Sequence, residues 1–445
     1  MNSKQKILIL GAGIAGMYAA ERLAEDQDSE VTLLEATGHL GGRCFSFFDE
    51  KSGETIDNGQ HLFAGAYSDF FDFLTRCDAM EKVNGFGELK IPFYSPAKGD
   101  EYNLNLGDGS KSSLLFGILG QSYFTLPERL KLLKTARKLI SMKHVDSSKT
   151  VAGFLHESGQ TELSMRAFWS PLTIAILNTS PLNAPLTLLA SALRKMFSEN
   201  SGRPLLMFPT TNYADLFANY CHIMASRHAK IEYQARVKRI IINDGLAQAV
   251  ELENGDILHA DIIVSALPYH ALRKVLSDDI LALPGFKNLM FYRDSQILSA
   301  YLWYDKPIKT PAMFAFLNSA IQWGFNRRRL QPSESKFRYP SSFAFTVSDA
   351  DSLKDVNRYE IADLFSEILG DSMFEFKGLQ PAHCRVIRSY KATFEAYPEL
   401  EKYRIEQETE IPNFVLCGDW TQTGLPATIE GAARSGRLAV EVLQK

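Results

Sequence analysis

Three glycines near the start of the chain, Gly11, Gly13 and Gly16, have the spacing of a turn that binds phosphate. An apolar run over residues 7–10 leads into them and an apolar-rich stretch follows, which predicts a strand, a tight turn and a helix. In such a unit the first glycine permits the turn, the second lets a pyrophosphate approach the backbone, and the third lets the helix pack on the strand. The free N–H groups at the helix start then face the phosphates.

An acidic residue completes this unit. A second predicted strand over residues 31–34 ends at Glu35, close to the separation of about 20 residues at which an acid accepts a hydrogen bond from a ribose hydroxyl. Strand, glycines, helix, strand and acid occur in the order of a βαβ dinucleotide site, which disfavours the alternative of a chance glycine-rich turn. The sequence has no second GxGxxG, so an NAD(P)H site is not visible, and we predict no metal site.

The composition is that of a globular chain. Its 445 residues are 45% hydrophobic and 22% charged, which excludes a disordered protein, and the length gives a prior of about three domains. A formal net charge of -4 gives no attraction to nucleic acid. The five cysteines are scattered without a C-x-x-C pair, as in reduced cytosolic proteins. We find no signal peptide and no run of 18 apolar residues, so any membrane contact must be peripheral.

One segment, residues 114–140, has the pattern of such a contact. Thr125 and Glu128 have capping-box spacing with Pro127 in the first turn, which predicts a helix start. A helical wheel collects apolar residues on one half and the lysines opposite: Leu126, Leu130, Leu132, Leu133, Ala136, Leu139 and Ile140 against Lys131, Lys134 and Lys138. An apolar run ending in aromatics precedes it. We weigh an interfacial membrane helix against a core helix with a solvated lysine face. The expected location is cytoplasmic, peripheral on the cytoplasmic face of the inner membrane.

The pattern E-x5-G-G-R over residues 35–43 resembles the flavoprotein superfamily of amine oxidases and carotenoid desaturases, whose G-G-R loop passes close to the pyrophosphate of FAD. The resemblance implies FAD rather than NAD as the cofactor. It also implies that residues 57–61 (DNGQH) lie beside the flavin ring, where a plain turn with a satisfied histidine is the alternative. The residue at Val237 is implied to lie against the adenine through its backbone.

The end of the chain carries a second part of this resemblance. A strand is predicted to end at Gly418 and Asp419, and a helix to begin near Thr428. Asp419 is placed to bind a ribityl hydroxyl or a phosphate-bound water. The helix N-terminus can stabilise the anion of a reduced flavin, typically by about 0.3–1 kcal/mol. The complete set of implied cofactor residues is Gly11, Gly13, Ile14, Ala15, Gly16, Glu35, Ala36, Gly42, Arg43, Gly59, Gln60, His61, Val237, Gly418, Asp419, Thr428, Ile429 and Ala432.

The expected fold is α/β, with a discontinuous Rossmann-like FAD-binding domain, a mixed-sheet substrate domain and a helical, membrane-contacting subdomain. The FAD domain is expected in three parts, residues 1–80, 206–272 and 406–445. Residues 81–205 are expected to form the helical subdomain and residues 273–405 the substrate sheet. The basic run at residues 327–329 is expected to be a solvated loop.

Residues 57–67, 169–181 and 417–432 closely resemble the hydroxysqualene dehydroxylases, also called squalene-associated FAD-dependent desaturases. The resemblance covers essentially the whole chain. It implies that hydroxysqualene and reduced flavin give squalene, water and oxidised flavin in a bacterial squalene and hopanoid route. The chain departs from amine oxidases at Thr428, where those enzymes usually carry an aromatic wall of an amine cage.

This chemistry needs a proton donor near the flavin. His61 is the first candidate and Tyr67 the second, while a purely structural His61 stays an alternative. The implied partners are a long-chain isoprenoid such as hydroxysqualene, the membrane, an unidentified electron donor, and no nucleic acid. Three other functions are weighed: a phytoene-desaturase-like enzyme, an amine oxidase, and a non-catalytic lipid carrier.

Overall fold

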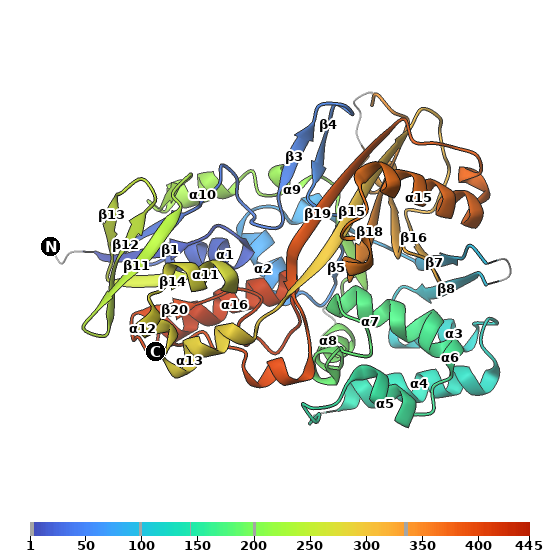
Figure 1. Cartoon of the computed structure of the whole chain (residues 1–445), viewed down its shortest axis with the longest axis horizontal. Helices are drawn as coiled ribbons and strands as arrows, with labels where there is room; N and C mark the ends of the chain where they lie inside the picture. Colours follow the sequence, from blue (N-terminus) through green and yellow to red (C-terminus); the bar gives the residue numbers. More distant parts are fainter. Residues whose placement is uncertain (1–3, 98–99, 143, 199–201, 333–336) are drawn as a thin grey trace.

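A five-stranded parallel sheet forms the centre of the half of the molecule that contains both termini (Figure 1). The computed structural model describes residues 4–97, 100–142, 144–198, 202–332 and 337–445. The strand order is β10 (Lys230–Glu232), β2 (Ser29–Leu34), β1 (Gln5–Leu10), β14 (Ile262–Ser265) and β20 (Phe414–Leu416). Segments from the start, middle and end of the chain therefore build one sheet.

The register aligns the carboxyl ends of these strands. Leu10 pairs with Leu34 on one side and with Ser265 on the other, and Ser265 pairs with Leu416. The chain leaves β1 toward β2 on one side, while β14 flanks β1 on the other, so β1 is a topological switch point. Ligands of open α/β sheets bind at the carboxyl ends beside such a point.

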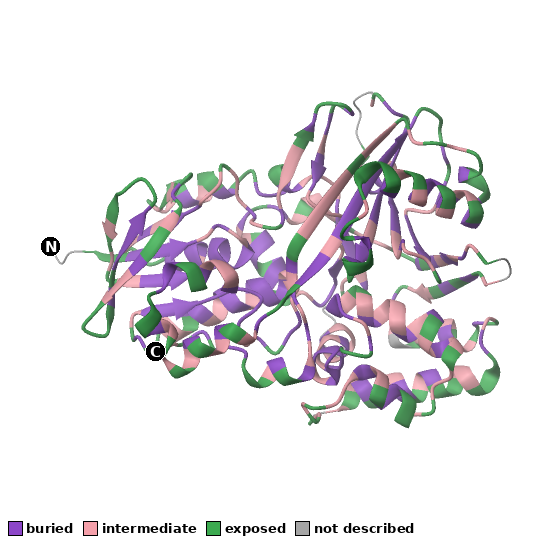
Figure 2. Cartoon of the chain, in the orientation of Figure 1, coloured by how far each residue is buried: buried purple, intermediate pink, exposed green. Residues whose placement is uncertain are grey.

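Helices α1 (Ile14–Leu23) and α16 (Ile429–Leu443) pack against each other beside the sheet. A Cβ added at Gly436 of α16 would lie 2.5 Å from the carbonyl oxygen of Ala15, so only glycine allows this approach. Both helices are mostly buried (Figure 2), in contrast to the exposed outer helices. The close contact places the middle of α16 against the first turn of α1.

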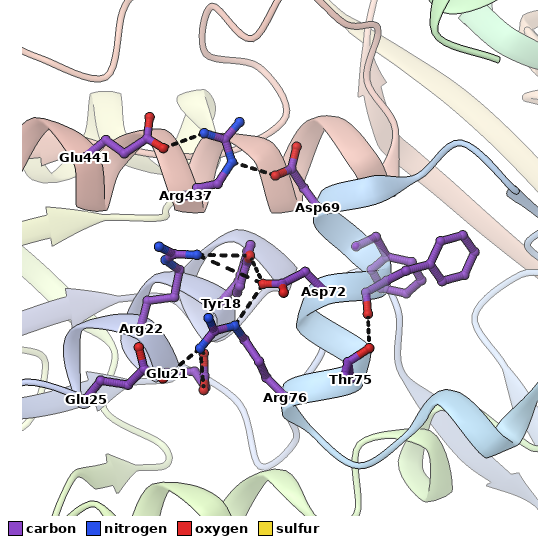
Figure 3. A network of polar contacts seen from close by, with 12 residues as sticks. Tyr18, Glu21, Arg22, Glu25, Asp69, Asp72, Thr75, Arg76, Arg437 and Glu441 are labelled. Carbon is purple, nitrogen blue, oxygen red and sulfur yellow. Dashed lines mark hydrogen bonds and ion pairs between the residues drawn. The ribbon is translucent and has the colours of Figure 1, made fainter. Parts of the chain in front are cut away.

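A charged network clamps helix α2 (Ser68–Arg76) against these two helices (Figure 3). Arg76 donates to Asp72 at 2.8 Å and pairs with the buried Glu21 of α1 at 3.5 Å. Asp69 accepts from Arg437 of α16 at 2.6 Å. Because these pairs join three helices that are far apart in sequence, they fix the outer face of this part of the molecule.

An antiparallel three-stranded sheet and short helices complete this half. The sheet has the order β11 (Val237–Asn243), β12 (Leu246–Leu252) and β13 (Ile257–His259), and β12 contacts β14. The short helices are α9 (Tyr213–Leu216), α10 (Tyr220–Ser226), α11 (Tyr269–Val275), α12 (Asp278–Leu281) and α13 (Pro284–Lys287).

A seven-stranded sheet forms the core of the other half (Figure 1). Its order is β19 (His383–Phe394), β15 (Asp294–Tyr304), β18 (Ser341–Ser348), β17 (Trp323–Asn326), β16 (Met313–Phe316), β7 (Leu89–Tyr94) and β8 (Tyr102–Gly107). The pairs are antiparallel except β16 with β7. Helices α15 (Arg358–Ser372) and α14 (Arg327–Leu330) flank it. Residues 81–205 were expected to form the helical subdomain, whereas β7 and β8 of this range lie at one edge of the seven-stranded sheet.

The remaining helices lie beneath this sheet in the view of Figure 1. They are α3 (Lys111–Leu119), α4 (Leu126–Ser141), α5 (Val151–Glu157), α6 (Glu162–Ser164), α7 (Ser170–Leu177) and α8 (Leu186–Ser198), with a π-helical turn over Met165–Trp169. The predicted capping box of α4 is present, with Thr125 as N-cap. The buried side chains of α4 are Leu132, Thr135 and Leu139, whereas Leu126 and Leu130 are exposed.

Small sheets join the two halves. One is β3 (Ser46–Asp49) with β4 (Glu54–Asp57), and another has the order β5 (Phe63–Ala64), β9 (Leu206–Pro209) and β6 (Val83–Gly85). Glu54 of β4 is buried and accepts from Arg327 at 2.8 Å and from Arg328 at 2.6 Å. The expectation that residues 327–329 form a solvated loop was therefore wrong for these two arginines, because a distant buried carboxylate pairs with them.

No helix among the described residues is long and apolar enough to cross a membrane. The architecture agrees with the predicted α/β class, with parallel strands in the sheet that carries the glycine motif.

Candidate functional site

The glycine turn at the end of β1 has the geometry of a phosphate cradle. Gly11 has φ of +100°, and a Cβ at Gly16 would lie 2.0 Å from the carbonyl oxygen of Gly11, so both positions require glycine. Around Gly13, in contrast, the nearest heavy atom to an added Cβ is 4.0 Å away. Gly13 is the N-cap of α1 and no side chain caps this helix start. The turn thus leaves space and free N–H groups for an anion.

The G-G-R loop lies directly on this turn. Gly41 donates its N–H to the carbonyl of Ala12 at 2.8 Å. Gly41 and Gly42 have φ of +94° and +58°, and a Cβ at Gly42 would lie 2.9 Å from the Cα of Gly13. Two positive-φ residues in succession and this close approach explain both glycines.

Glu35 is buried at the end of β2 and faces the same turn. One carboxylate oxygen accepts from the N–H of Ala12 at 2.9 Å, and the other accepts from the N–H and hydroxyl of Thr37 at 2.8 Å each. A carboxylate offers about four acceptor positions, so one remains for a ribose hydroxyl. Ala36 follows it on the same edge.

The segment that enters β11 lies beside Glu35. Ala235 donates to the Glu35 carbonyl at 2.8 Å, and Gln234 donates to the Thr37 carbonyl at 3.1 Å. These bonds bring Val237, at the start of β11, to the neighbourhood of the acid. The arrangement fits the implied place of an adenine, next to the ribose.

An ion pair joins the N-terminal and C-terminal motifs. The Arg43 guanidinium lies 2.6 Å from the Asp419 carboxylate, and the arginine side chain is 47% exposed while the aspartate is 7% exposed. Arg43 also donates to the carbonyl of Ala392. The N–H of Gly418 donates to the Ser435 hydroxyl of α16 at 2.7 Å. Residues from three separate segments therefore meet at the carboxyl edge of the sheet.

Helix α16 begins beside this pair. The Thr428 hydroxyl caps it by accepting from the N–H of Gly431 at 3.0 Å, and Ile429 and Ala432 lie on its first turns. Its second residue, Glu430, is fully buried and accepts from Lys195 at 3.0 Å and from the N–H of Phe70 at 2.9 Å. Glu430 therefore also caps the N-terminus of α2.

One ring nitrogen of His61 is engaged in a hydrogen bond to the backbone. Nδ1 lies 3.0 Å from the carbonyl oxygen of Gly59, and because a carbonyl only accepts, Nδ1 carries the proton. Burial, together with the charge of Arg43, lowers the pKa of His61 to about 4. The ring is therefore neutral at pH 7 with Nε2 as an acceptor. This geometry runs against a proton-donor role for His61.

Tyr67 is the N-cap residue of α2 and lies near both Thr428 and Glu430. Burial and the Glu430 charge raise the pKa of Tyr67 far above its usual range, and a hydrogen bond from Thr428 offsets only part of this rise. The phenol therefore keeps its proton at every physiological pH. No hydrogen bond between Tyr67 and His61 is found among the described residues.

Some residues at this site cannot be recognised from the sequence pattern. Ser299 of β15 lies against the 57–61 loop, with its hydroxyl oxygen 3.1 Å from the position of a Cβ at Gly59. Lys195 of α8 reaches Glu430 from the helical region. A serine in a strand and a lysine in an amphipathic helix are unremarkable locally, so only the tertiary contacts identify them.

Comparisons with known proteins agree with this geometry. The model of the family described as flavin containing amine oxidoreductase matches residues 14–444. The chain is 26% identical to the hydroxysqualene dehydroxylase of Sinorhizobium fredii over 446 residues, 98% of each chain. It is 26% identical to that of Rhodopseudomonas palustris, over 98% of this chain and 97% of the relative. The 15-cis-phytoene desaturase of Arabidopsis thaliana is 24% identical over 97% of this chain and 78% of the relative.

Solved structures have the same fold. An oxidoreductase from Methanosarcina mazei has a TM-score of 0.75 at 16% identity and covers 99% of this chain and 100% of its own. Cyclohexylamine oxidase from Brevibacterium oxydans has a TM-score of 0.73 at 16% identity, with 99% of both chains covered. At these identities the likeness concerns the fold.

Proposed function

We propose, from the premise that the chain belongs to the flavin containing amine oxidoreductases, that it is an FAD-dependent oxidoreductase that converts hydroxysqualene to squalene. FAD is its cofactor, in agreement with the family and with the phosphate cradle at Gly13. We propose hydroxysqualene as the substrate because the chain matches two hydroxysqualene dehydroxylases along nearly their whole length. The match to the phytoene desaturase of Arabidopsis covers 78% of that chain, less than the 98% and 97% covered in the two dehydroxylases. This difference favours the dehydroxylase.

The reaction breaks the carbon–oxygen bond of an allylic alcohol and forms a carbon–hydrogen bond in its place. Bound FAD in its reduced form supplies the hydride, and with one proton the hydroxyl leaves as water. A separate reductant must deliver two electrons to the flavin for each turnover. The chain's own residues have to bind both molecules, exclude water and hold the proton at the leaving oxygen.

We assign the holding of FAD to the residues at the carboxyl edge of the parallel sheet. The amides of Gly13 to Gly16 would hold the pyrophosphate, and Glu35 would accept a hydrogen bond from the ribose. Arg43 and Asp419 would hold the phosphate and ribityl part, and the N-terminus of α16 would stabilise negative charge on the reduced ring. The proposal keeps the three-part cofactor domain over residues 1–80, 206–272 and 406–445, which is supported by the single parallel sheet that these parts form.

Tyr67 is the better of the two proton-donor candidates. Its phenol stays protonated because burial and Glu430 raise its pKa. His61 presents an acceptor, since its Nδ1 proton is directed at Gly59. In this proposal Tyr67 donates a hydrogen bond to the leaving hydroxyl, and neutral His61 accepts one from the substrate or from a water.

The test is product analysis with the flavin in a defined state. The purified protein is photoreduced without oxygen and mixed with hydroxysqualene, and squalene formation is followed against flavin reoxidation. One squalene for each flavin oxidised is expected, and none from the oxidised protein. If instead the oxidised protein introduces double bonds into phytoene and the reduced protein makes no squalene, the desaturase alternative is correct.

Tyr67→Phe tests the proton donor within the same assay. We expect squalene formation to fall about 100-fold or more, the usual effect of losing a general acid, with FAD still bound. Tyr304→Phe is the matched control, because the Tyr304 hydroxyl, in a strand of the other sheet, is buried and has no hydrogen-bond partner among the residues that the structure describes. Equal rates for Tyr67→Phe and Tyr304→Phe would remove Tyr67 from the mechanism.

The proposal also includes peripheral contact with a membrane through helices α3 and α4, which pack against each other. The apolar side chains that support it are exposed: Leu115 at 42%, Phe116 at 69%, Leu126 at 59% and Leu130 at 55%. Exposed basic residues of α4 border them: Lys131, Lys134, Arg137 and Lys138. Apolar side chains beside basic ones suit the surface of an anionic bilayer. The proposal places this contact on the cytoplasmic face of the inner membrane.

Flotation with vesicles of phosphatidylglycerol and phosphatidylcholine tests the contact. The triple variant Phe116→Ser, Leu126→Ser, Leu130→Ser is expected to lose flotation. A control variant replaces equally exposed apolar residues elsewhere, Leu246→Ser, Ile257→Ser and Phe374→Ser, and is expected to float like the wild type. Unchanged flotation of the first variant shows that α3 and α4 do not touch the bilayer.

A further inference from the structure

One arginine outside every sequence motif holds the loop that carries Asp419. Arg404 follows the short helical turn Pro398–Lys402, and its side chain is completely buried. A guanidinium in the interior loses its hydration and is stable only if its donors are satisfied. Its carboxylate partner, Glu401, lies 3.4 Å away, so this ion pair does not satisfy the five N–H donors by itself.

The other acceptors all belong to the stretch from Asp419 to Leu425. Arg404 donates to the carbonyls of Asp419 at 3.0 Å, Leu425 at 2.8 Å and Trp420 at 3.4 Å, to the carbonyl of Thr421, and to the hydroxyl of Thr423 at 3.3 Å. This stretch lies between β20 and α16 and has no regular structure. Its buried carbonyls need hydrogen-bond donors, and the N–H groups of the Arg404 guanidinium donate to several of them.

Neighbours of Arg404 strengthen the same attachment. The Gln407 side chain donates to the Thr421 hydroxyl at 2.9 Å, and the N–H of Gln422 donates to the Ile405 carbonyl at 2.7 Å. Tyr292 donates to the Trp420 carbonyl at 2.9 Å. Residues 404–407 therefore hold the loop through several hydrogen bonds, most of which come from Arg404 at the start of this segment.

The loop positions two parts of the proposed cofactor site. Its first residue is Asp419, whose carboxylate pairs with Arg43 at 2.6 Å. It then leads through Leu425 to Thr428, the N-cap of α16. A shift of the loop backbone would move both the carboxylate and the helix N-terminus.

We propose that Arg404 is a positioning residue for the cofactor, which fixes the backbone of residues 419–425 so that Asp419 and the start of α16 are in place before FAD binds. The inference rests on the FAD assignment and not on the isoprenoid substrate. Arginine is required rather than lysine, because its planar fork serves several carbonyls at once, whereas a lysine ammonium is a single point charge.

The test compares two arginines that both donate to carbonyls. Arg404→Lys keeps the charge and loses the fork. Arg388→Lys makes the same change in β19, where Arg388 donates to the carbonyls of Leu353 and Val356, neither of which is an implied cofactor residue. FAD affinity of the deflavinated full chain is measured by quenching of flavin fluorescence, with the flavin circular dichroism of the bound form and the thermal midpoint of the apoprotein.

We expect Arg404→Lys to weaken FAD binding about tenfold or more, since it loses several charge-assisted hydrogen bonds, and to change the flavin circular dichroism. Arg388→Lys should leave both near the wild-type values even where it lowers the thermal midpoint equally. Wild-type affinity and dichroism for Arg404→Lys, or equal weakening by both variants, overturns the proposal.

Hydrogen exchange on the wild-type apoprotein gives a second measurement that does not depend on a variant that folds. The amides of Thr421 and Gln422 donate to Gly418 and Ile405, so they should be protected already without FAD. If they exchange freely until FAD is added, the loop is ordered by the cofactor and the proposal fails. No isoprenoid enters either experiment, so their failure is distinct from failure of the dehydroxylase assay.

Discussion

Two glycines of the N-terminal turn are required for different reasons. Gly16 has no space for a side chain, because a Cβ would lie 2.0 Å from a backbone oxygen. Gly13 has space, since the nearest atom is 4.0 Å away. Packing inside the protein therefore explains Gly16, whereas the approach of a ligand explains Gly13.

This difference predicts opposite outcomes for the same substitution. Gly13→Ala should leave the thermal midpoint of the apoprotein unchanged and lower FAD affinity, because its methyl group enters the space for the pyrophosphate. Gly16→Ala should fail to fold or unfold at a much lower temperature. Thermal unfolding of the apoprotein and FAD titration measure both. A Gly13→Ala protein with full FAD affinity contradicts the phosphate site.

His61 gives a pH dependence of stability. Its pKa is lowered to about 4 in the folded protein and returns to about 6.5 when the chain unfolds. Between these values the unfolded chain binds the extra proton, so the free energy of unfolding falls as the pH falls. The contribution is complete above pH 6.5 and is lost as the pH approaches 4.

Urea unfolding of the apoprotein at pH 7.5 and pH 5 measures this effect. The wild type should lose more stability between the two pH values than His61→Gln, which has no group that titrates there. Subtracting the loss of unfolding free energy in His61→Gln from the loss in the wild type removes the contribution of the carboxylates, because both proteins contain them. An equal loss in the two proteins means that His61 is not buried as described.

At the scale of elements, one buried ion pair joins the helical region to the cofactor half. Lys195 of α8 and Glu430 of α16 are both buried and lie 3.0 Å apart. Burial raises the pKa of Glu430, and the Lys195 charge opposes this rise. Removing the lysine leaves a buried carboxylate without its cation.

Lys195→Met is therefore expected to destabilise the protein by roughly 3–5 kcal/mol, as is usual when one member of a buried pair is removed. The double variant Lys195→Met, Glu430→Gln should recover part of this loss. Lys230→Met is the control, because its pair with Glu30 is exposed and is worth at most about 1 kcal/mol. Urea unfolding measures all three, and equal effects of the two lysines refute the buried-pair account.

Helix α4 shows what local sequence patterns predict and what a helical wheel leaves undecided. The capping box at Thr125 was predicted correctly, since it depends on residues three apart. The wheel put Leu126 and Leu130 on the same apolar half as Leu132, and the structure exposes the first two and buries the third. Which side of a helix is buried depends on its neighbours, here α3 and α8, and the wheel contains no information on them.

At the scale of the whole molecule, three distant segments converge at one edge of a sheet. FAD at about a hundredfold excess over its dissociation constant should stabilise the protein by about 2.7 kcal/mol. Hydrogen exchange should slow together in residues 11–16, 234–237 and 418–432. ADP, which has only the adenine half, should protect the first two segments alone. Protection by FAD confined to the N-terminal turn contradicts convergence.

Features that depend on neighbouring residues could be predicted from the sequence. The glycine turn, the capping box at Thr125, the acid at Glu35 and the α/β class follow from periodicity, caps and steric limits that act over a few residues. The family resemblance added FAD and the C-terminal motif. These local constraints predict strands and helices, but they do not predict which elements pack against each other.

The tertiary structure alone decided what each polar group contacts. It paired Arg327 with Glu54, turned the Nδ1 proton of His61 toward Gly59, and placed Arg404 on the carbonyls of the Asp419 loop. The physical reason is that burial and hydrogen-bond partners depend on which atoms the fold brings together, and a charge or a proton responds to those atoms wherever they lie in the sequence.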